Sequence, residues 1–444
     1  MFAPPRFLVI DDKELHLNAI VSIFQQLGSP CLGIRYDPAA IPARVHFRGV
    51  RCLFVDLHLV DAGAVTAHTQ HYALIASMLE NNIHPDGGPF MLVVWTEHAQ
   101  LCQELTDYLN ANLDPQRPYA RPLAVLGFDK TQYIDVATGQ PISPATSAAL
   151  RQRIETEINA VPQLNALLDW EGDVLAAAGA TLAALTLLVP PPERTTTAFP
   201  GALDVVLSRL AREAVGSSHV AVDPRAAISS ALAPILADRI INQNVTPRTT
   251  QLWAQAVTRA GGAPLPALTP QETGRINRML HLATPGSETI RTADWGAVVE
   301  FPPELWNDPS LQELFGASSE QILGDEFKIA NVADRPNCRP RLVRVGAACD
   351  HAQGRRGPLT YLLGIEVPAG IHRSKGPASE WSSPLFTLDG GGPFTLLANC
   401  RFPLTRIAAQ SAGWNVQYRL REQLLMTLIT HANAYLARPG ILKL

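Results

Sequence analysis

Charged side chains are scarce in this 444-residue chain, and the common motifs of nucleotide and metal enzymes are absent. Only 17% of the residues are charged and the formal net charge is −4, which disfavours the broad basic surface of a general nucleic-acid binder. Neither G-x-x-x-x-G-K-[ST] nor H-E-x-x-H occurs. The sequence therefore gives no support for a P-loop nucleotidase or a zinc protease of that type.

Paired cysteines and membrane-length apolar runs are also lacking. The six cysteines have no regular spacing and form no CxxC, and no signal peptide is recognisable, which predicts a cytoplasmic chain. One uncharged apolar stretch, Val174 to Val189, has 16 residues, fewer than the roughly 20 that a spanning helix needs. We expect it to form a buried helix, with no membrane partner.

Five short apolar runs lie within the first 130 residues and are typical of parallel strands buried on both faces. They are Arg6 to Ile10, Cys31 to Tyr36, Cys52 to Val55, Met91 to Trp95 and Leu123 to Phe128. Helix-length segments separate most of them. The pattern predicts an α/β domain over residues 1–160, with a doubly wound (βα)5 arrangement.

The expected helices follow from periodicity and from capping residues. Apolar residues at positions 15, 19, 23 and 27 repeat at helical spacing, and Gly28 would end that helix. Residues 65–82 and 97–112 are long enough for two more helices. Ser143 and Pro144 are a good N-cap and first residue for a last one.

Polar or aromatic residues stand at or beside the ends of four of the runs: Asp11, Asp12, Asp56, Thr96, Phe128 and Lys130. Because sites in open α/β sheets lie beyond the carboxyl ends of the strands, three carboxylates, a hydroxyl and an ammonium should converge in one crevice. Any one of these acids alone would be read as a solvated loop residue or a helix cap. The ordered set favours a common site.

This arrangement resembles the receiver domain of two-component signalling. Its marks are an acidic pair after the first strand, a phosphoacceptor Asp after the third, Thr or Ser after the fourth and Lys after the fifth. The resemblance implies that Asp56 accepts a phosphoryl group from a sensor histidine kinase. It also implies that Asp11, Asp12 and Asp56 bind Mg²⁺ with the backbone carbonyl of His58, and that Thr96 and Lys130 contact the phosphoryl oxygens.

The residue types suit that chemistry. A carboxylate is a poor nucleophile toward a phosphoryl group unless a divalent cation neutralises the charge that both carry. Mg²⁺ prefers oxygen ligands and usually keeps several waters, so one or two further acids near the acceptor are enough. The charge of an attached phosphate could then alter contacts at Thr96.

The chain departs from the common receiver pattern at the residues that follow the fifth strand. Receivers commonly carry an aromatic residue three positions before the Lys, where this chain has Gly127, and Phe128 follows one place later. Thr131 replaces the usual Pro after the Lys. We therefore expect that phosphoryl acceptance is retained and that its readout differs.

The remaining two thirds should form two further regions. Residues 161–292 are rich in Ala and Leu, and helical spacing recurs at Asp204 to Val215 and Pro224 to Ile241. Residues 293–444 should form a β-rich module with a C-terminal helix. Its strands are expected at 341–347, 361–367, 384–388 and 394–398, and the helix, from Val416 to Ala437, places Leu420, Leu424, Leu428 and Tyr435 on one stripe.

Two groups of residues in the last region offer other chemistry. Cys338 and the run Cys349 to His351 include metal-ligand types, but their spacing matches no familiar zinc pattern and favours a buried thiol beside a turn. Arginines at six positions form a basic cluster that is either a solvated face or an anion site: Arg335, Arg339, Arg341, Arg344, Arg355 and Arg356.

Two hypotheses for the function follow. The receiver-like part joined to a module with ACDHAQ, RLREQLL and ARPG also resembles response-receiver proteins of Detocs-type anti-phage systems. There, one receiver protein buffers phosphoryl groups while a second response regulator carries the toxic output. Alternatively, the C-terminal region is an effector, gated by the receiver, that acts on nucleic acid or nucleotide. Either hypothesis is compatible with a homodimer.

Overall fold

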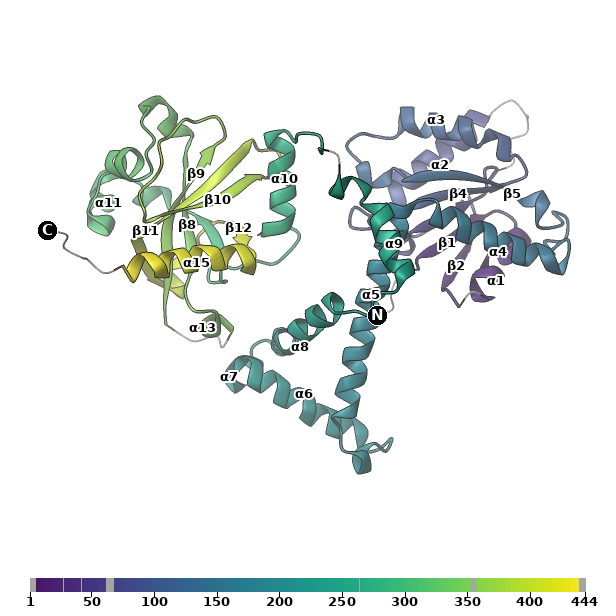
Figure 1. The fold of residues 1–444 in the computed structure, drawn as a ribbon, viewed down its shortest axis with the longest axis horizontal. Helices are drawn as coiled ribbons and strands as arrows, with labels where there is room; N and C mark the ends of the chain where they lie inside the picture. Colours follow the sequence, from purple (N-terminus) through teal and green to yellow (C-terminus); the bar gives the residue numbers. More distant parts are fainter. Residues whose placement is uncertain are drawn as a thin grey trace. The chain divides into compact units, whose positions relative to one another are not determined.

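The computed structural model describes residues 5–26, 28–40, 42–60, 68–262, 264–352 and 357–438 (Figure 1). The chain divides into two compact units. The N-terminal unit comprises Met1–Gly179 with Arg239–Ala263, and the C-terminal unit comprises Ala180–Asp238 with Pro264–Leu444. The division predicted from the sequence, 1–160, 161–292 and 293–444, stays a prediction.

The N-terminal unit contains a sheet of five parallel strands, as expected. These are β1 (Phe7–Asp11), β2 (Cys31–Arg35), β3 (Cys52–Val55), β4 (Met91–Thr96) and β5 (Ala124–Asp129). The strand order is β2-β1-β3-β4-β5. In this doubly wound order the direction of winding reverses between β1 and β3, and ligand sites form there, outside the carboxyl ends of the strands.

Helices cover both faces of this sheet (Figure 1). One face is covered by α2 (His68–Asn82) and α3 (Cys102–Asn112), and the other by α1 (Glu14–Gln26) and α4 (Pro144–Asn159). Successive strand residues point to opposite faces, so Leu92 and Val94 pack toward α2 and α3 while Val93 packs toward α1 and α4. Because helices cover both faces of the sheet, the residues of β4 on either face are buried, and all of them before Thr96 are apolar.

The connection from β2 to β3 differs from the predicted (βα)5 pattern. Its described residues contain a single 3-10 turn, Arg44–Phe47, where an α-helix was expected. Pro38 and Pro42 lie in the segment before that turn, and proline lacks the backbone N–H that an α-helix needs in its interior. The other strand connections and the last helix have the predicted helical character, so the correction concerns this crossover alone.

The buried face of α1 also differs from the predicted one. Leu15 is 52% exposed, whereas His16, Leu17, Ile20 and Phe24 are buried. Ile23 of the predicted stripe is buried as expected. Residue 27, the last in the predicted stripe, lies outside the described residues. The helix itself is therefore confirmed, but it is rotated so that His16 at its first turn faces inward.

The middle of the chain is helical, as predicted. It consists of α5 (Pro162–Leu187), α6 (Phe199–Val215), α7 (Ser217–Val220), α8 (Pro224–Ile241), α9 (Pro247–Ala256) and α10 (Pro270–His281). The stretch from Val174 is helical up to Leu187, but the prediction that it is buried was wrong. Only a stripe at every fourth position (177, 181, 185 and 189) is buried, and Leu182 is 61% exposed.

Among the residues that the structure describes, no helix is long and apolar enough to span a membrane.

The C-terminal unit contains an antiparallel sheet of seven strands. They are β6 (Leu282–Ala283), β7 (Ala297–Glu300), β8 (Arg339–Val345), β9 (Pro358–Pro368), β10 (Glu380–Thr387), β11 (Pro393–Ile407) and β12 (Val416–Leu420). Their order is β10-β11-β9-β8-β7-β12-β6. The predicted β-rich module is thus confirmed, and the four predicted strands correspond to β8, β9, β10 and β11.

Helices flank this sheet as well. They are α11 (Asp308–Phe315), α12 (Ser319–Gln321), α13 (Ala348–Ala352), α14 (Ala408–Ser411) and α15 (Glu422–Leu436). One apolar cluster joins α11 to the sheet through Leu311, and another joins α15 through Leu425 and Leu428. Figure 1 shows α15 lying across the sheet.

The predicted C-terminal helix begins later than expected. Residues 416–420 form β12, and α15 starts only at Glu422. Tyr418 and Leu420 are both buried, which is the period of two that a strand requires. Leu420 therefore belongs to the sheet, whereas Leu424 and Leu428 occupy the predicted helical stripe.

Candidate functional site

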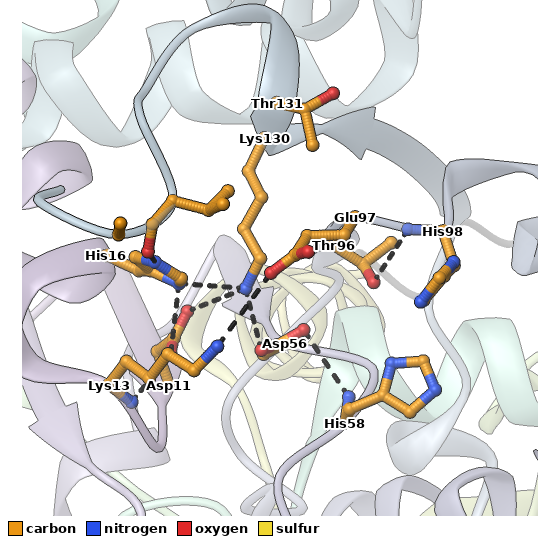
Figure 2. A network of polar contacts seen from close by, with 12 residues as sticks. Asp11, Lys13, His16, Asp56, His58, Thr96, Glu97, His98, Lys130 and Thr131 are labelled. Atoms are coloured by element: carbon orange, nitrogen blue, oxygen red, sulfur yellow. Dashed lines mark hydrogen bonds and ion pairs between the residues drawn. The ribbon is translucent and has the colours of Figure 1, made fainter. Parts of the chain in front are cut away.

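The carboxyl ends of the N-terminal strands bring most of the predicted polar residues together (Figure 2). Asp11 is the last residue of β1, and Asp12 follows it. Asp56 comes directly after β3, and its backbone N–H donates to the carbonyl of Ile10 at 3.0 Å. Because β1 and β3 pair in parallel, the two strand ends place their acids side by side at the point where the winding reverses.

Lys130 enters this cluster from the end of β5. Its ammonium donates to Asp56 Oδ2 at 2.8 Å and lies 3.7 Å from Asp11 Oδ2. The side chain is buried, although lysine is rarely buried without a partner. Figure 2 shows the extended Lys130 side chain pointing between the two carboxylates, so the lysine and the acids form one network.

The three carboxylates form a candidate metal site. Asp11, Asp12 and Asp56 each offer an oxygen atom, and these atoms lie within 4.8 Å of one another. Asp11 Oδ2 and Asp12 Oδ1 are buried and accept no hydrogen bond. With all groups ionised, Lys130 compensates only one of the three negative charges. The donor set and its charge therefore fit a metal ion, and hard oxygen ligands suit a hard divalent cation.

Burial and mutual repulsion perturb the protonation of the cluster. Burial raises the pKa of Asp11 from 3.8 to about 7 together with the neighbouring charge of Asp56, while Lys130 and the N–H of Lys13 oppose the change. The N–H of Lys13 donates to Asp11 Oδ1 at 2.8 Å. The pocket thus binds a proton on an acid that would ordinarily be ionised, and a cation that replaced the proton would relieve the repulsion.

Thr96 and Phe128 reach different environments. Thr96 ends β4 and is buried, and its hydroxyl accepts from the N–H of His98 at 3.2 Å. Phe128 does not join the site, because it packs edge-on against Phe54 on the side of the sheet that α1 and α4 cover. Gly127 faces α3 instead, where a Cβ would stand 2.9 Å from Cys102 Cβ, so the position has no room for an aromatic side chain.

The sequence reasoning named His58 only for its backbone carbonyl, and it missed the imidazole rings that gather beside the acids. The ring of His58 lies edge-on to those of His71 and His98, with ring centroids 4.6 Å and 5.1 Å apart. The backbone N–H of His58 donates to Asp56 Oδ1 at 3.4 Å. Burial lowers the pKa of both His58 and His71, which favours neutral rings. His58 and His98 each stand two residues after a strand-end residue, Asp56 or Thr96, and that offset is the signal that was available.

His16 was missed for a different reason. It lies 3.0 Å from Lys130 and 2.7 Å from the carbonyl of Val136, which is 120 residues away in the chain. Burial lowers the pKa of its imidazole. The sequence shows only a histidine beside a leucine at the start of a helix, and nothing in that spacing marks a contact with a distant loop.

Among the residues whose side chains the structure describes, those that suggested other chemistry in the C-terminal region do not form a group with metal-ligand spacing. Arg341 forms a buried bidentate pair with Glu366, which also accepts from Tyr418. Arg344 is buried and donates to a backbone carbonyl, and Arg355 and Arg356 lie outside the described residues. Cys338 is a buried thiol, and over the described part of the chain the three acids above are the one group with metal-ligand spacing.

Comparisons with protein families, with curated proteins and with solved structures gave no match.

Proposed function

We propose that the chain is a phosphoacceptor signalling protein whose receiver-like N-terminal unit takes a phosphoryl group onto Asp56 in a Mg²⁺-dependent reaction. The observation that carries the proposal is the contact of 2.8 Å between the Lys130 ammonium and Asp56 Oδ2, beside a three-carboxylate cluster at the winding reversal. The proposed donor is the phosphohistidine of a sensor histidine kinase, and the strand order is compatible with a receiver fold.

In the proposed reaction a carboxylate oxygen of Asp56 attacks the phosphorus atom. The new P–O bond forms as the P–N bond of the donor breaks, and the leaving imidazole nitrogen takes a proton from solvent. Lys130 pairs with the phosphoryl oxygens, since its ammonium already lies beside the attacked carboxylate. Mg²⁺ held by Asp11, Asp12 and Asp56 would supply positive charge that offsets repulsion between the carboxylate and the phosphoryl group.

The proposed cellular role is that of a phosphoryl buffer in a cytoplasmic, anti-phage system of the two-component type, with a second response regulator as effector. In the described part of the C-terminal unit, Arg341 forms a buried bidentate pair with Glu366 and so is not free to bind a nucleotide. No observation favours the effector hypothesis over the buffer.

Phosphoryl acceptance can be tested without the kinase. The full chain is incubated with Mg²⁺ and phosphoramidate, a small donor that also carries a P–N bond, and acyl phosphate is detected by its lability to hydroxylamine. We expect labelling of the wild type and of the control Asp86→Asn, whose carboxylate is 75% exposed, but not of Asp56→Asn. Equal labelling of Asp56→Asn would remove Asp56 as the acceptor.

Buffer and effector roles are distinguished by turnover. The phosphorylated full chain is assayed for nuclease activity and for nucleotide hydrolysis against the Asp56→Asn protein. A buffer should show no turnover above that of the variant. Multiple turnovers that depend on phosphorylation would contradict the buffer role and support the effector.

A further inference from the structure

His16 has two hydrogen-bond partners that fix the protonation of its imidazole ring. Nε2 lies 2.7 Å from the backbone carbonyl oxygen of Val136. A carbonyl oxygen can only accept, so Nε2 carries the hydrogen and donates it. In a neutral imidazole the other nitrogen, Nδ1, then bears a lone pair and acts as an acceptor.

That acceptor faces the lysine of the site. Nδ1 lies 3.0 Å from the Nζ atom of Lys130, which donates to it. The Lys130 ammonium is thus surrounded by three groups, with Asp56 Oδ2 at 2.8 Å and Asp11 Oδ2 at 3.7 Å as the other two. Figure 2 shows His16 on the opposite side of the ammonium from His58 and His98.

The three groups differ in what the proposed reaction does to them. Phosphorylation removes the carboxylate charge of Asp56, and a metal ion would engage Asp11. His16 is neutral and is held by a backbone carbonyl, so it keeps its lone pair directed at Lys130 throughout. A lysine on a flexible four-carbon stem needs such a fixed partner to remain aligned with the group that is transferred.

We propose that His16 is a positioning residue for phosphoryl acceptance. Nδ1 holds the Lys130 ammonium beside Asp56, and Nε2 anchors the ring to the loop that follows β5. Because the same loop begins at Lys130, the two bonds fix both ends of the segment from Lys130 to Val136 against α1. This inference rests on the proposed function of Asp56.

Two substitutions separate the two bonds of His16. In His16→Asn the amide oxygen takes the approximate place of Nδ1, so the acceptor for Lys130 is kept and the bond to Val136 is lost. In His16→Gln the amide nitrogen takes the approximate place of Nε2, so the bond to Val136 is kept and the acceptor is lost. Circular dichroism and thermal melting establish that each variant is folded.

We expect His16→Asn to retain most of the wild-type rate of labelling by phosphoramidate, and His16→Gln to lose about tenfold to a hundredfold, the loss that misplacement by about 1 Å can cause. Equal rates in both variants, or a larger loss in His16→Asn, would overturn the positioning role. An absence of labelling in the wild type would instead overturn the proposed function itself, whatever His16 does.

A spectroscopic measurement tests the contact without any phosphoryl donor and without a His16 variant. The ¹⁵N shifts of His16 should show a protonated Nε2 and a hydrogen-bonded lone pair at Nδ1. In Lys130→Met the Nδ1 shift should move toward that of a free lone pair while Nε2 stays unchanged. An Nδ1 shift that does not respond to the loss of Lys130 would refute the contact, even if wild-type Asp56 is phosphorylated.

Discussion

Replacing Asp11 by asparagine should stabilise the protein in the absence of metal. The wild-type carboxyl has a pKa raised from 3.8 to about 7, chiefly by burial. At about 1.36 kcal/mol for each pKa unit, keeping this group ionised in the folded state costs about 4 kcal/mol above pH 7. An uncharged amide of the same shape removes that cost, and its oxygen can still accept from the N–H of Lys13, as the wild-type carboxylate does at 2.8 Å.

The effect should depend on pH with a definite sign. Because the folded-state pKa lies above the unfolded one, the folded wild type binds more protons between about pH 4 and pH 7, and its stability falls as the pH rises through that window. The advantage of Asp11→Asn should therefore grow from near zero at about pH 4 to a few kcal/mol at pH 8. Above about pH 7 it should level off.

Hydrogen exchange of the β1 and β4 amides in the presence of EDTA measures the relevant opening free energy, since these strands form the core beneath the site. Asp86→Asn makes the same chemical change on the surface of the same unit, where the side chain is 75% exposed, and should alter stability by less than about 0.5 kcal/mol. If Asp11→Asn were no more stable than wild type at pH 8, the raised pKa of Asp11 and the cost of its burial would be refuted.

The same carboxyl also links metal binding to pH. Magnesium must displace the proton of Asp11 in order to bind, so the affinity of the wild type should rise by up to about tenfold per pH unit below pH 7 and level off above it. Calorimetric titration at pH 6, 7 and 8 measures this. In Asp11→Asn the affinity should be much weaker and nearly independent of pH in this range. A wild-type affinity that does not change from pH 6 to pH 8 would contradict the raised pKa.

Two further predictions concern packing and a buried ion pair. Gly127→Ala should destabilise the N-terminal unit by about 1–3 kcal/mol in denaturant titrations, because the new methyl group would stand 2.9 Å from Cys102 Cβ; an unchanged midpoint would show that α3 moves away freely. Glu366→Ala should destabilise the C-terminal unit by about 3–5 kcal/mol, because it leaves Arg341 buried without its partner. The control Asp389→Asn breaks an ion pair whose carboxylate is 87% exposed, and it should lower the free energy of unfolding by less than about 1 kcal/mol in the same titration. Equal losses of stability in Glu366→Ala and Asp389→Asn would contradict the role of burial.

The strand-end acids could be predicted because their position depends on few factors. Once the runs at residues 7–11 and 52–55 are parallel neighbours, Asp11 and Asp56 must lie at the same edge of the sheet. The hydrophobic pattern predicts the two strands, and the doubly wound arrangement places their carboxyl ends at one edge of the sheet. To predict the position of His16, one must also know the rotation of α1 about its axis and the path of a loop 120 residues away. Neither follows from local spacing.

The C-terminal unit was predicted less completely for a related reason. Residues 416–437 carry leucines at helical spacing, and a strand followed directly by a helix satisfies that spacing as well as one helix does. Tertiary pairing with β7 decides the outcome, since Tyr418 and Arg419 pair with Val298 and Ala297. A short apolar run does not indicate whether it will pair with a strand that is distant in sequence.

The alternation of β5 limits how a change at Asp56 can reach the surface. Residues 127 and 128 point to opposite faces of the sheet, so an aromatic residue one position late lies on the wrong side for a switch next to α3. Phe128 is packed against Phe54 and beneath the guanidinium of Arg153, 5.6 Å from the ring centroid. Among the described residues, Asp56 is bonded to the backbone of Ile10 and of His58 and to the ammonium of Lys130. Through Lys130 and His16 it is linked to the loop at Val136.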